Sequence, residues 1–194
     1  MKLSKEILNS SIKNSSNELL QLSKDIKNIV FPEPTIVEFE TVKLNDKYIV
    51  EILNDIPAGY AKALKDTDFI YVFSLKNASA ELQKDIFQGL CASRDIQDSK
   101  DFEGKKDFCR ANHSQSECLY VGRSQKLKSR LKQHLDAGGE GIFAMHMLRW
   151  IAGISIKAEI HCYQFDGKSN LIIQALEDGL WDQFKPMFGR KGER

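Results

Sequence analysis

A tyrosine, an arginine and a histidine lie close together in the segment from Tyr120 to His134, which carries five lysines or arginines and no acid. Arg130 and His134 are four residues apart, so on a helix they lie one turn apart on the same face. Three leucines with the same spacing predict that helix and its buried face. These are Leu127, Leu131 and Leu135. A guanidinium can bind an anion, and an imidazole or a phenol can move a proton, so the three groups could converge on one point. The alternative is an ordinary surface helix with a solvated basic face.

The composition is that of a globular protein. Of its 194 residues, 42% are hydrophobic, so one domain with additions, or two small domains, are expected. The net charge is +1, but the segment from Cys118 to Arg194 holds twelve lysines or arginines against eight acids. This local excess of positive charge fits a polyanionic partner.

Nothing in the sequence indicates export or membrane insertion. Charged residues precede any apolar run at the N-terminus, so it does not resemble a secretory signal, and no apolar stretch is long enough to span a membrane. The four cysteines form no Cys-x-x-Cys pair, as expected for free thiols in a reducing compartment. We therefore expect a cytoplasmic protein without a membrane partner.

Residues 1–65 are expected to form an N-terminal extension. A helix is predicted to about residue 30, because apolar residues recur at alternating steps of four and three. This apolar repeat consists of Leu8, Ile12, Leu19, Leu22, Ile26 and Ile29. The repeat would dock on the body of the protein or pair with a second copy of the chain. Strands are then predicted over 35–44 and 48–53, and a short helix over 58–65.

Residues 66–194 alternate between strand and helix patterns, as expected of a small α/β domain. The continuous apolar run 69–75 predicts a buried strand, and Leu82, Ile86 and Leu90 predict the helix after it. A long polar loop is expected next, and it covers 95–116. After the basic helix, further elements are predicted from spacing and capping residues. They are a helix over 142–152, a strand over 154–165 and a helix over 170–184 begun by Asn170.

Five features in a fixed order resemble the GIY-YIG nuclease family, which is named for two short strand motifs. Phe69-Ile70-Tyr71 resembles the first motif and Tyr120-Val121-Gly122 resembles the second. Arg130 lies ten residues after the second tyrosine, as the family arginine does. His134 matches a histidine found in restriction-type members, and Glu177 matches the metal-binding glutamate of a late helix.

The resemblance implies a domain of the GIY-YIG type, with a three-stranded antiparallel sheet flanked by helices. The two motifs are about fifty residues apart, much further than in the short hairpin of the family, so residues 79–117 would be an insertion. The extension 1–65 and this insertion would supply sequence recognition. That elaboration favours a restriction-type enzyme.

The resemblance also implies an endonuclease that hydrolyses DNA with one Mg²⁺ or Mn²⁺ ion bound by Glu177. Arg130 would neutralise the phosphate. A tyrosine would act as the general base; Tyr71 is favoured, while Tyr120 and His134 are alternatives. Basic residues of the helix and of the C-terminus would contact DNA. These are Arg123, Lys126, Lys128, Lys132, Arg190 and Lys191. No nucleotide cofactor is expected.

Other functions remain open on the same residues. The family usually has an asparagine after the glutamate, and the tail 186–192 contains none, which favours a nucleic-acid-binding protein that does not cleave. A repair or mobile-element nuclease would use the same site, and a weaker alternative is a partner-binding protein that uses the N-terminal helix. The sequence leaves the recognition site, the cleavage pattern and the oligomeric state open. A duplex cutter would act as a homodimer or bind each strand in turn.

Overall fold

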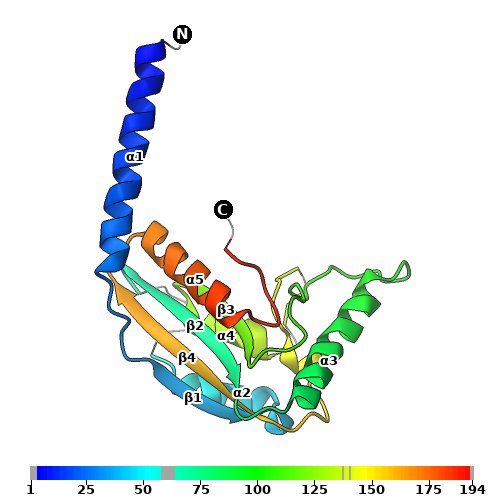
Figure 1. Ribbon diagram of the computed structural model, residues 1–194. Coiled ribbons are helices and arrows are strands. Elements are labelled where there is room, and N and C mark those ends of the chain that lie inside the picture. Colours follow the sequence, from blue (N-terminus) through cyan, green and yellow to red (C-terminus); the bar gives the residue numbers. More distant parts are fainter. Residues whose placement is uncertain (1–3, 58–63, 137, 140, 193–194) are drawn as a thin grey trace.

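The computed structural model describes residues 4–57, 64–136, 138–139 and 141–192. These residues form an α/β protein with a four-stranded antiparallel sheet in the order β1-β4-β2-β3 (Figure 1). The strands are β1 (Thr35–Glu40), β2 (Thr67–Leu75), β3 (Cys118–Ser124) and β4 (Lys157–Asp166). The α-helices are α1 (Lys5–Lys27), α2 (Asp46–Asn54), α3 (Ala80–Asp98), α4 (Leu127–Leu135) and α5 (Asn170–Phe184).

Both faces of the central strand β2 are apolar because helices cover both. Phe69, Tyr71 and Phe73 belong to the larger core, which also holds the buried apolar residues of α2 and α4 and the apolar face of α3. Ile70 packs instead with Ile173 of α5, on the opposite face of the sheet. β3 is an edge strand, so side chains from both faces can meet beside it.

The fourth strand of the sheet, β1, comes from the N-terminal extension. It pairs antiparallel with β4 along its whole length. Val37 and Phe39 of β1 are buried in the larger core. The expected three-stranded sheet is therefore four-stranded in the structure, and residues 35–56 share the core of the later segments.

The strand predicted over 48–53 is wrong, because this segment lies in α2. Asn45 caps the helix, and its side chain accepts a hydrogen bond from the Tyr48 N–H at 3.0 Å. Ile49, Ile52 and Leu53 are its buried residues, and their spacing of three and four is that of one helix face. Here the helical spacing outweighs the β-branched side chains that favoured a strand.

The helix predicted over 142–152 is also wrong. This segment contains a 3₁₀ turn at Met147–Arg149, preceded by His146 in the left-handed conformation with φ 47°. A left-handed residue interrupts a right-handed helix. Residues 142–146 consequently form a loop, which we call the 142–146 loop.

The other predicted elements agree with the structure apart from their ends. The polar loop predicted over 95–116 begins later, because α3 continues to Asp98. Ser169 rather than Asn170 caps α5, by accepting a hydrogen bond from the Ile172 N–H. The helix predicted over 58–65 lies largely outside the described residues.

Helix α1 projects from the body of the protein (Figure 1). None of its 23 residues is buried, and the apolar side chains before Leu22 are exposed. The chain reaches α5 where α1 ends, and Ile29 packs beside Ile173 there. Docking of the apolar repeat on the body is thus confined to its end. Neither α1 nor any other described helix is long and apolar enough to cross a membrane.

Two substitutions should separate the contributions of β1 and α1 to stability. Phe39→Ala removes a ring that is 2% exposed, and it should lower the free energy of unfolding by about 3–5 kcal/mol. Leu19→Ala alters a side chain that is 66% exposed, and it should change that free energy by less than about 0.5 kcal/mol. Urea denaturation followed by circular dichroism measures both. Equal effects of the two substitutions would contradict the described core.

Candidate active site

The Tyr71 hydroxyl reaches the edge of the sheet by crossing a glycine. Tyr71 on β2 pairs with Gly122 on β3, and a Cβ atom at Gly122 would lie 2.5 Å from the Tyr71 Oη and 2.7 Å from its Cζ. Any other residue at position 122 would therefore collide with the phenol. The glycine of the second predicted motif is what lets the tyrosine of the first motif extend past the edge strand.

Arg130 of α4 meets both tyrosines. Its Nε lies 3.3 Å from the Tyr71 Oη, and its Nη2 lies 3.4 Å from the Tyr120 Oη. The two phenol rings are parallel, with an angle of 3° and a centroid distance of 6.1 Å. The guanidinium also donates to the Phe143 carbonyl at 2.9 Å and to the Gln133 side chain at 3.0 Å. These four contacts hold the cation in one orientation.

His134 is fully buried one turn further along α4. Its Nδ1 accepts a hydrogen bond from the Met145 N–H at 3.3 Å, so in the neutral ring the proton is assigned to Nε2. That Nε2 lies 3.1 Å from the Tyr71 Oη and donates to it. Burial, with the Arg130 charge adding to it, lowers the pKa of His134 well below its ordinary value, which keeps the ring neutral.

The Tyr71 oxygen consequently accepts two hydrogen bonds, one from His134 and one from Arg130. Both donors favour the ionised phenol. Burial acts in the opposite direction and raises the pKa of Tyr71, with the Arg130 charge opposing that rise. In this tautomer both ring nitrogens of His134 are engaged, and His134 donates a hydrogen bond to Tyr71.

Glu177 approaches from α5, on the other side of the edge strand. Its side chain is largely buried, and its Oε2 lies 3.2 Å from the Arg123 Nε. Burial raises the pKa of Glu177 to about 7, while the charge of Arg123 opposes the rise. The carboxyl is thus poised between its neutral and charged forms near neutral pH. Arg123 also donates to the Asn170 side chain.

One cavity of about 600 Å³ joins these groups. Tyr71, Tyr120, Arg130 and Glu177 all line it, and Glu177 is the only carboxylate among the described residues that do so. Five arginines also line it. They are Arg94, Arg110, Arg123, Arg130 and Arg190. The cavity therefore combines strong positive charge, two phenols and a single carboxyl, which suits a phosphate-bearing ligand.

Sequence reasoning missed Arg94 and Arg110, which come from the segment 79–117. Arg94 continues the four-residue spacing of Leu82, Ile86 and Leu90 along α3, so an arginine on an otherwise apolar stripe was the signal that marked it. No spacing marks Arg110. Its place depends on backbone hydrogen bonds to the C-terminal tail, such as the one that its carbonyl accepts from the Gly189 N–H at 2.8 Å.

The predicted lysines do not line this cavity. Lys126 and Lys132 are exposed and Lys128 is partly exposed, all on or next to α4, and Lys132 pairs with Asp136 at 2.5 Å. Lys191 pairs with Asp182 and borders a second hollow beside the cavity. Of the six residues expected to contact DNA, Arg123 and Arg190 are the two that line the cavity itself.

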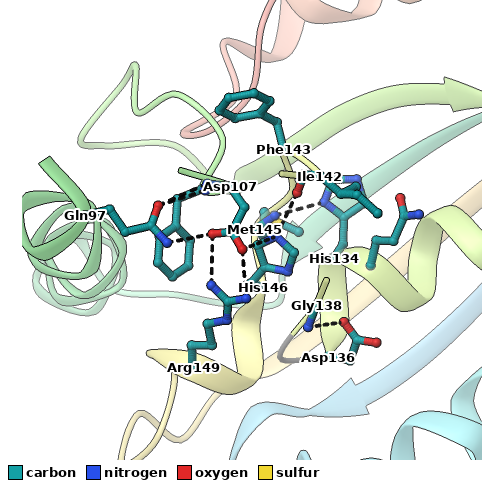
Figure 2. Close-up of polar contacts among 12 residues, drawn as sticks. Gln97, Asp107, His134, Asp136, Gly138, Ile142, Phe143, Met145, His146 and Arg149 are labelled. Carbon is teal, nitrogen blue, oxygen red and sulfur yellow. Dashed lines mark hydrogen bonds and ion pairs between the residues drawn. The ribbon is translucent and has the colours of Figure 1, made fainter. Parts of the chain in front are cut away.

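The 142–146 loop supplies two backbone groups, the Phe143 carbonyl that holds Arg130 and the Met145 N–H that holds His134. Figure 2 shows the contact between Met145 and His134. The Asp107 carboxylate is buried nearby and accepts hydrogen bonds from Arg149 at 2.9 and 2.8 Å and from Gln97 at 2.6 Å. The Asp107 backbone carbonyl accepts the Ala144 N–H at 3.0 Å. Asp107 therefore ties α3 and the Arg149 turn to the loop that orients the site.

His146, at the end of this loop, has an unfavourable backbone conformation and a ring nitrogen without a hydrogen bond among the described residues. Its backbone is left-handed, with φ 47°, and its buried Nδ1 has no hydrogen-bond partner among the described residues. Its Nε2 donates to the Ile142 carbonyl at 2.9 Å. Such strain persists where the surrounding contacts fix the conformation. Here the conformation presents the Met145 N–H to His134 and the Phe143 carbonyl to Arg130.

Comparisons of the chain with family models, with curated proteins and with solved structures find no match. The functional argument therefore depends on the side chains themselves and on the cavity in which they meet.

The hydrogen bonds of His134 predict its protonation state. Its ring should remain neutral, with the proton on Nε2, down to a pH well below 6.5, because burial lowers its pKa from the ordinary 6.5. Nitrogen-15 NMR of the histidine side chains measures both the tautomer and the titration. His113, whose ring is partly exposed, serves as the internal comparison. A proton on the His134 Nδ1, or a titration near 6.5, would contradict this geometry.

Proposed function

We propose that this chain is a divalent-cation-dependent DNA endonuclease of the GIY-YIG type. The observation that carries the proposal is that Tyr71, Tyr120, Arg130 and Glu177, from four different elements, line one arginine-rich cavity, with His134 hydrogen-bonded to Tyr71. The sequence resemblance named these five residues by their motifs, order and spacing along the chain. Their meeting at one point is an independent observation, because it depends on the pairing of β2 with β3 and on the packing of α4 and α5.

The arginines fit the electrostatic demand of phosphodiester hydrolysis. Negative charge increases on the non-bridging oxygens as the phosphorus gains a fifth oxygen. The fixed guanidinium of Arg130 presents N–H groups to such oxygens, and the planar fork suits them better than an ammonium group does. Arg123 and Arg190 on the same wall neutralise further phosphate charge. Burial strengthens the interaction of these guanidinium charges with a phosphate, because less water is present to screen them.

Tyr71 is the group best arranged to receive a proton from the attacking water. In its ionised form the phenol is stabilised by hydrogen bonds from His134 at 3.1 Å and from Arg130 at 3.3 Å. The water oxygen attacks the phosphorus, its proton passes to the Tyr71 oxygen, and the bond to the leaving oxygen breaks. Tyr120, at 3.4 Å from Arg130, orients the water or the phosphate.

Glu177 is the residue that would hold Mg²⁺ or Mn²⁺. Its carboxyl borders the cavity and has a pKa of about 7, so it ionises readily when a cation is present. A single carboxylate suits Mg²⁺, which keeps most of its bound waters. A bound cation supplies positive charge that stabilises the departing oxygen. Arg123, which pairs with Glu177 at 3.2 Å, would turn toward the phosphate.

A nucleic-acid-binding protein without cleavage is the second candidate. Two observations favour it: the tail 186–192 has no asparagine, and Arg123 already occupies one oxygen of Glu177. This candidate retains the cationic wall and therefore binds DNA with a clear dependence on salt. It differs from the endonuclease in yielding no products.

The restriction-type role and the homodimer are part of the same proposal. Arg94 and Arg110 of the 79–117 segment line the cavity, so that segment is close enough to bound DNA to take part in recognition. The exposed apolar residues of α1, among them Leu8, Ile12 and Leu19, offer a surface for a second copy. Mass measurement in solution, with and without duplex DNA, tests the dimer.

Glu177→Gln should separate cleavage from binding. The substitution keeps the size of the side chain and removes its charge, so cleavage with Mg²⁺ should fall by at least about 100-fold, while DNA affinity in EDTA should not decrease. Asp178→Asn, which alters the neighbouring carboxylate outside the cavity lining, is the matched control and should cleave normally. If the folded wild-type protein with Mg²⁺ leaves duplex, branched and single-stranded DNA intact, the endonuclease proposal is wrong.

The raised pKa of Glu177 gives the activity a pH dependence. Below a pH of about 7 the carboxyl is mostly protonated, so the cleavage rate at limiting Mg²⁺ should rise about tenfold per pH unit and level off above it. The contribution of Glu177 to the stability of the folded protein changes with pH in the opposite direction. Between 4.5, the ordinary value, and 7 the Glu177 carboxyl binds more protons in the folded protein than in the unfolded chain, so without metal the contribution of this carboxyl to stability falls as the pH rises. Glu177→Gln should remove this contribution, which the difference in thermal unfolding between the wild type and the variant across this range measures.

A further inference from the structure

A second hollow adjoins the cationic cavity and shares part of its wall. Its volume is about 490 Å³. Arg110, Gly189 and Arg190 line both hollows. Gly189 has φ 103°, and a Cβ atom there would lie 2.8 Å from the Tyr120 ring, so this backbone packs directly against the site. A ligand in the cavity can therefore extend into the second hollow past Gly189.

The walls of the second hollow are tied together by backbone hydrogen bonds. The Asn112 N–H donates to the Met187 carbonyl at 2.7 Å, and the Gly189 N–H donates to the Arg110 carbonyl at 2.8 Å. The Asn112 side chain adds a bond to the Gly189 carbonyl at 2.9 Å. These bonds join the end of the 79–117 segment to the C-terminal tail, so the hollow is preformed and does not depend on a ligand.

Two aromatic rings and three cations line this hollow. The rings belong to His113 and Trp181, whose centroids lie 5.9 Å apart. The cations are Arg110, Arg190 and Lys191, and the described residues that line the hollow include no acid. Lys191 pairs with Asp182 outside the lining. The hollow thus offers an apolar aromatic surface within a positively charged rim.

Trp181 contacts the hollow through carbon. Its Nε1 is buried and has no hydrogen-bond partner among the described residues, while the residue as a whole is partly exposed and lines the hollow. The exposed part of the ring is therefore apolar. Such a surface binds the face of a planar base whatever its sequence, and does not read its edge.

We infer that the second hollow binds a single unstacked nucleotide next to the phosphate held in the main cavity. The base contacts Trp181 and His113, and its phosphate contacts Arg110 and Arg190. This inference rests on the proposed function only in that it takes DNA as the occupant of the main cavity. It predicts that the protein binds a strand in which a base lies outside the helical stack, as in single-stranded DNA or at an extruded nucleotide. It also predicts little preference among the bases.

The test compares two oligonucleotides with the same backbone, of which only one carries bases. One contains about twelve thymidines and the other has the same backbone with abasic sites. Both carry fluorescein, and anisotropy measures their affinity without divalent cation. Wild-type protein should bind the thymidine strand at least about fivefold more tightly. Trp181→Leu and His113→Ala should each lose this preference while still binding the abasic strand in a salt-dependent manner.

Phe184→Leu is the matched control, because Phe184 is an exposed ring on the same helix outside the lining of the hollow. It should keep the full preference. His113→Ala guards against misfolding of the Trp181 variant, since His113 lies in a loop and is not part of the core. Thermal unfolding verifies that each variant is folded.

The outcomes separate this inference from the proposed function. Equal binding of the two strands by wild-type protein, or a preference that survives in both variants, would overturn the nucleotide site and leave the endonuclease proposal intact. A preference that depends on Trp181 and His113, in a protein that cuts nothing with Mg²⁺, would support the nucleotide site and overturn the endonuclease. Wild-type protein that binds neither strand would overturn the nucleotide site.

Discussion

The hydroxyl group of Tyr71, held between Arg130 and His134, is the contact on which the site depends. It exists because three separate conditions meet: β2 pairs with β3, position 122 has no side chain, and α4 presents two residues one turn apart. Each condition comes from a different part of the chain. Placing a phenol, a guanidinium and a neutral imidazole together out of water is unfavourable unless each is hydrogen-bonded. The 142–146 loop and Gln133 provide the remaining partners of Arg130 and His134, and the buried Asp107 holds that loop.

The position of β3 at the edge of the sheet explains how the site is assembled. The phenols come from the face covered by α4, while Glu177 comes from α5 on the opposite face. In the middle of a sheet these groups would be separated by the backbone. At the edge the two faces join in one cavity, and the C-terminal tail and the 79–117 segment close its outer side with arginines. A short carboxylate and a long phenol can thus line the same cavity.

The residues that local pattern could find were those with a fixed spacing. Arg130 and His134 follow from one helical turn, and the buried strand of Tyr71 follows from an apolar run. Arg94 continues the apolar spacing of its helix and could have been marked by it, whereas no local pattern marks Arg110, because its place depends on backbone hydrogen bonds to the C-terminal tail. The wrong helix over 142–152 has a local cause that sequence does not display: His146 is left-handed because its neighbours hold it so. The place of β1 in the sheet depends likewise on a partner over a hundred residues away.

Tyr71→Phe is the most direct test of the account, since it removes one oxygen and keeps the ring over Gly122. Single-turnover cleavage of DNA at saturating protein with Mg²⁺ isolates the chemical step, with Tyr163→Phe on the opposite face of the sheet as control. We expect Tyr71→Phe to slow cleavage by at least about 100-fold without weakening DNA binding, and Tyr163→Phe to cleave normally. Cleavage by Tyr71→Phe at the wild-type rate would contradict the central role of this hydroxyl group.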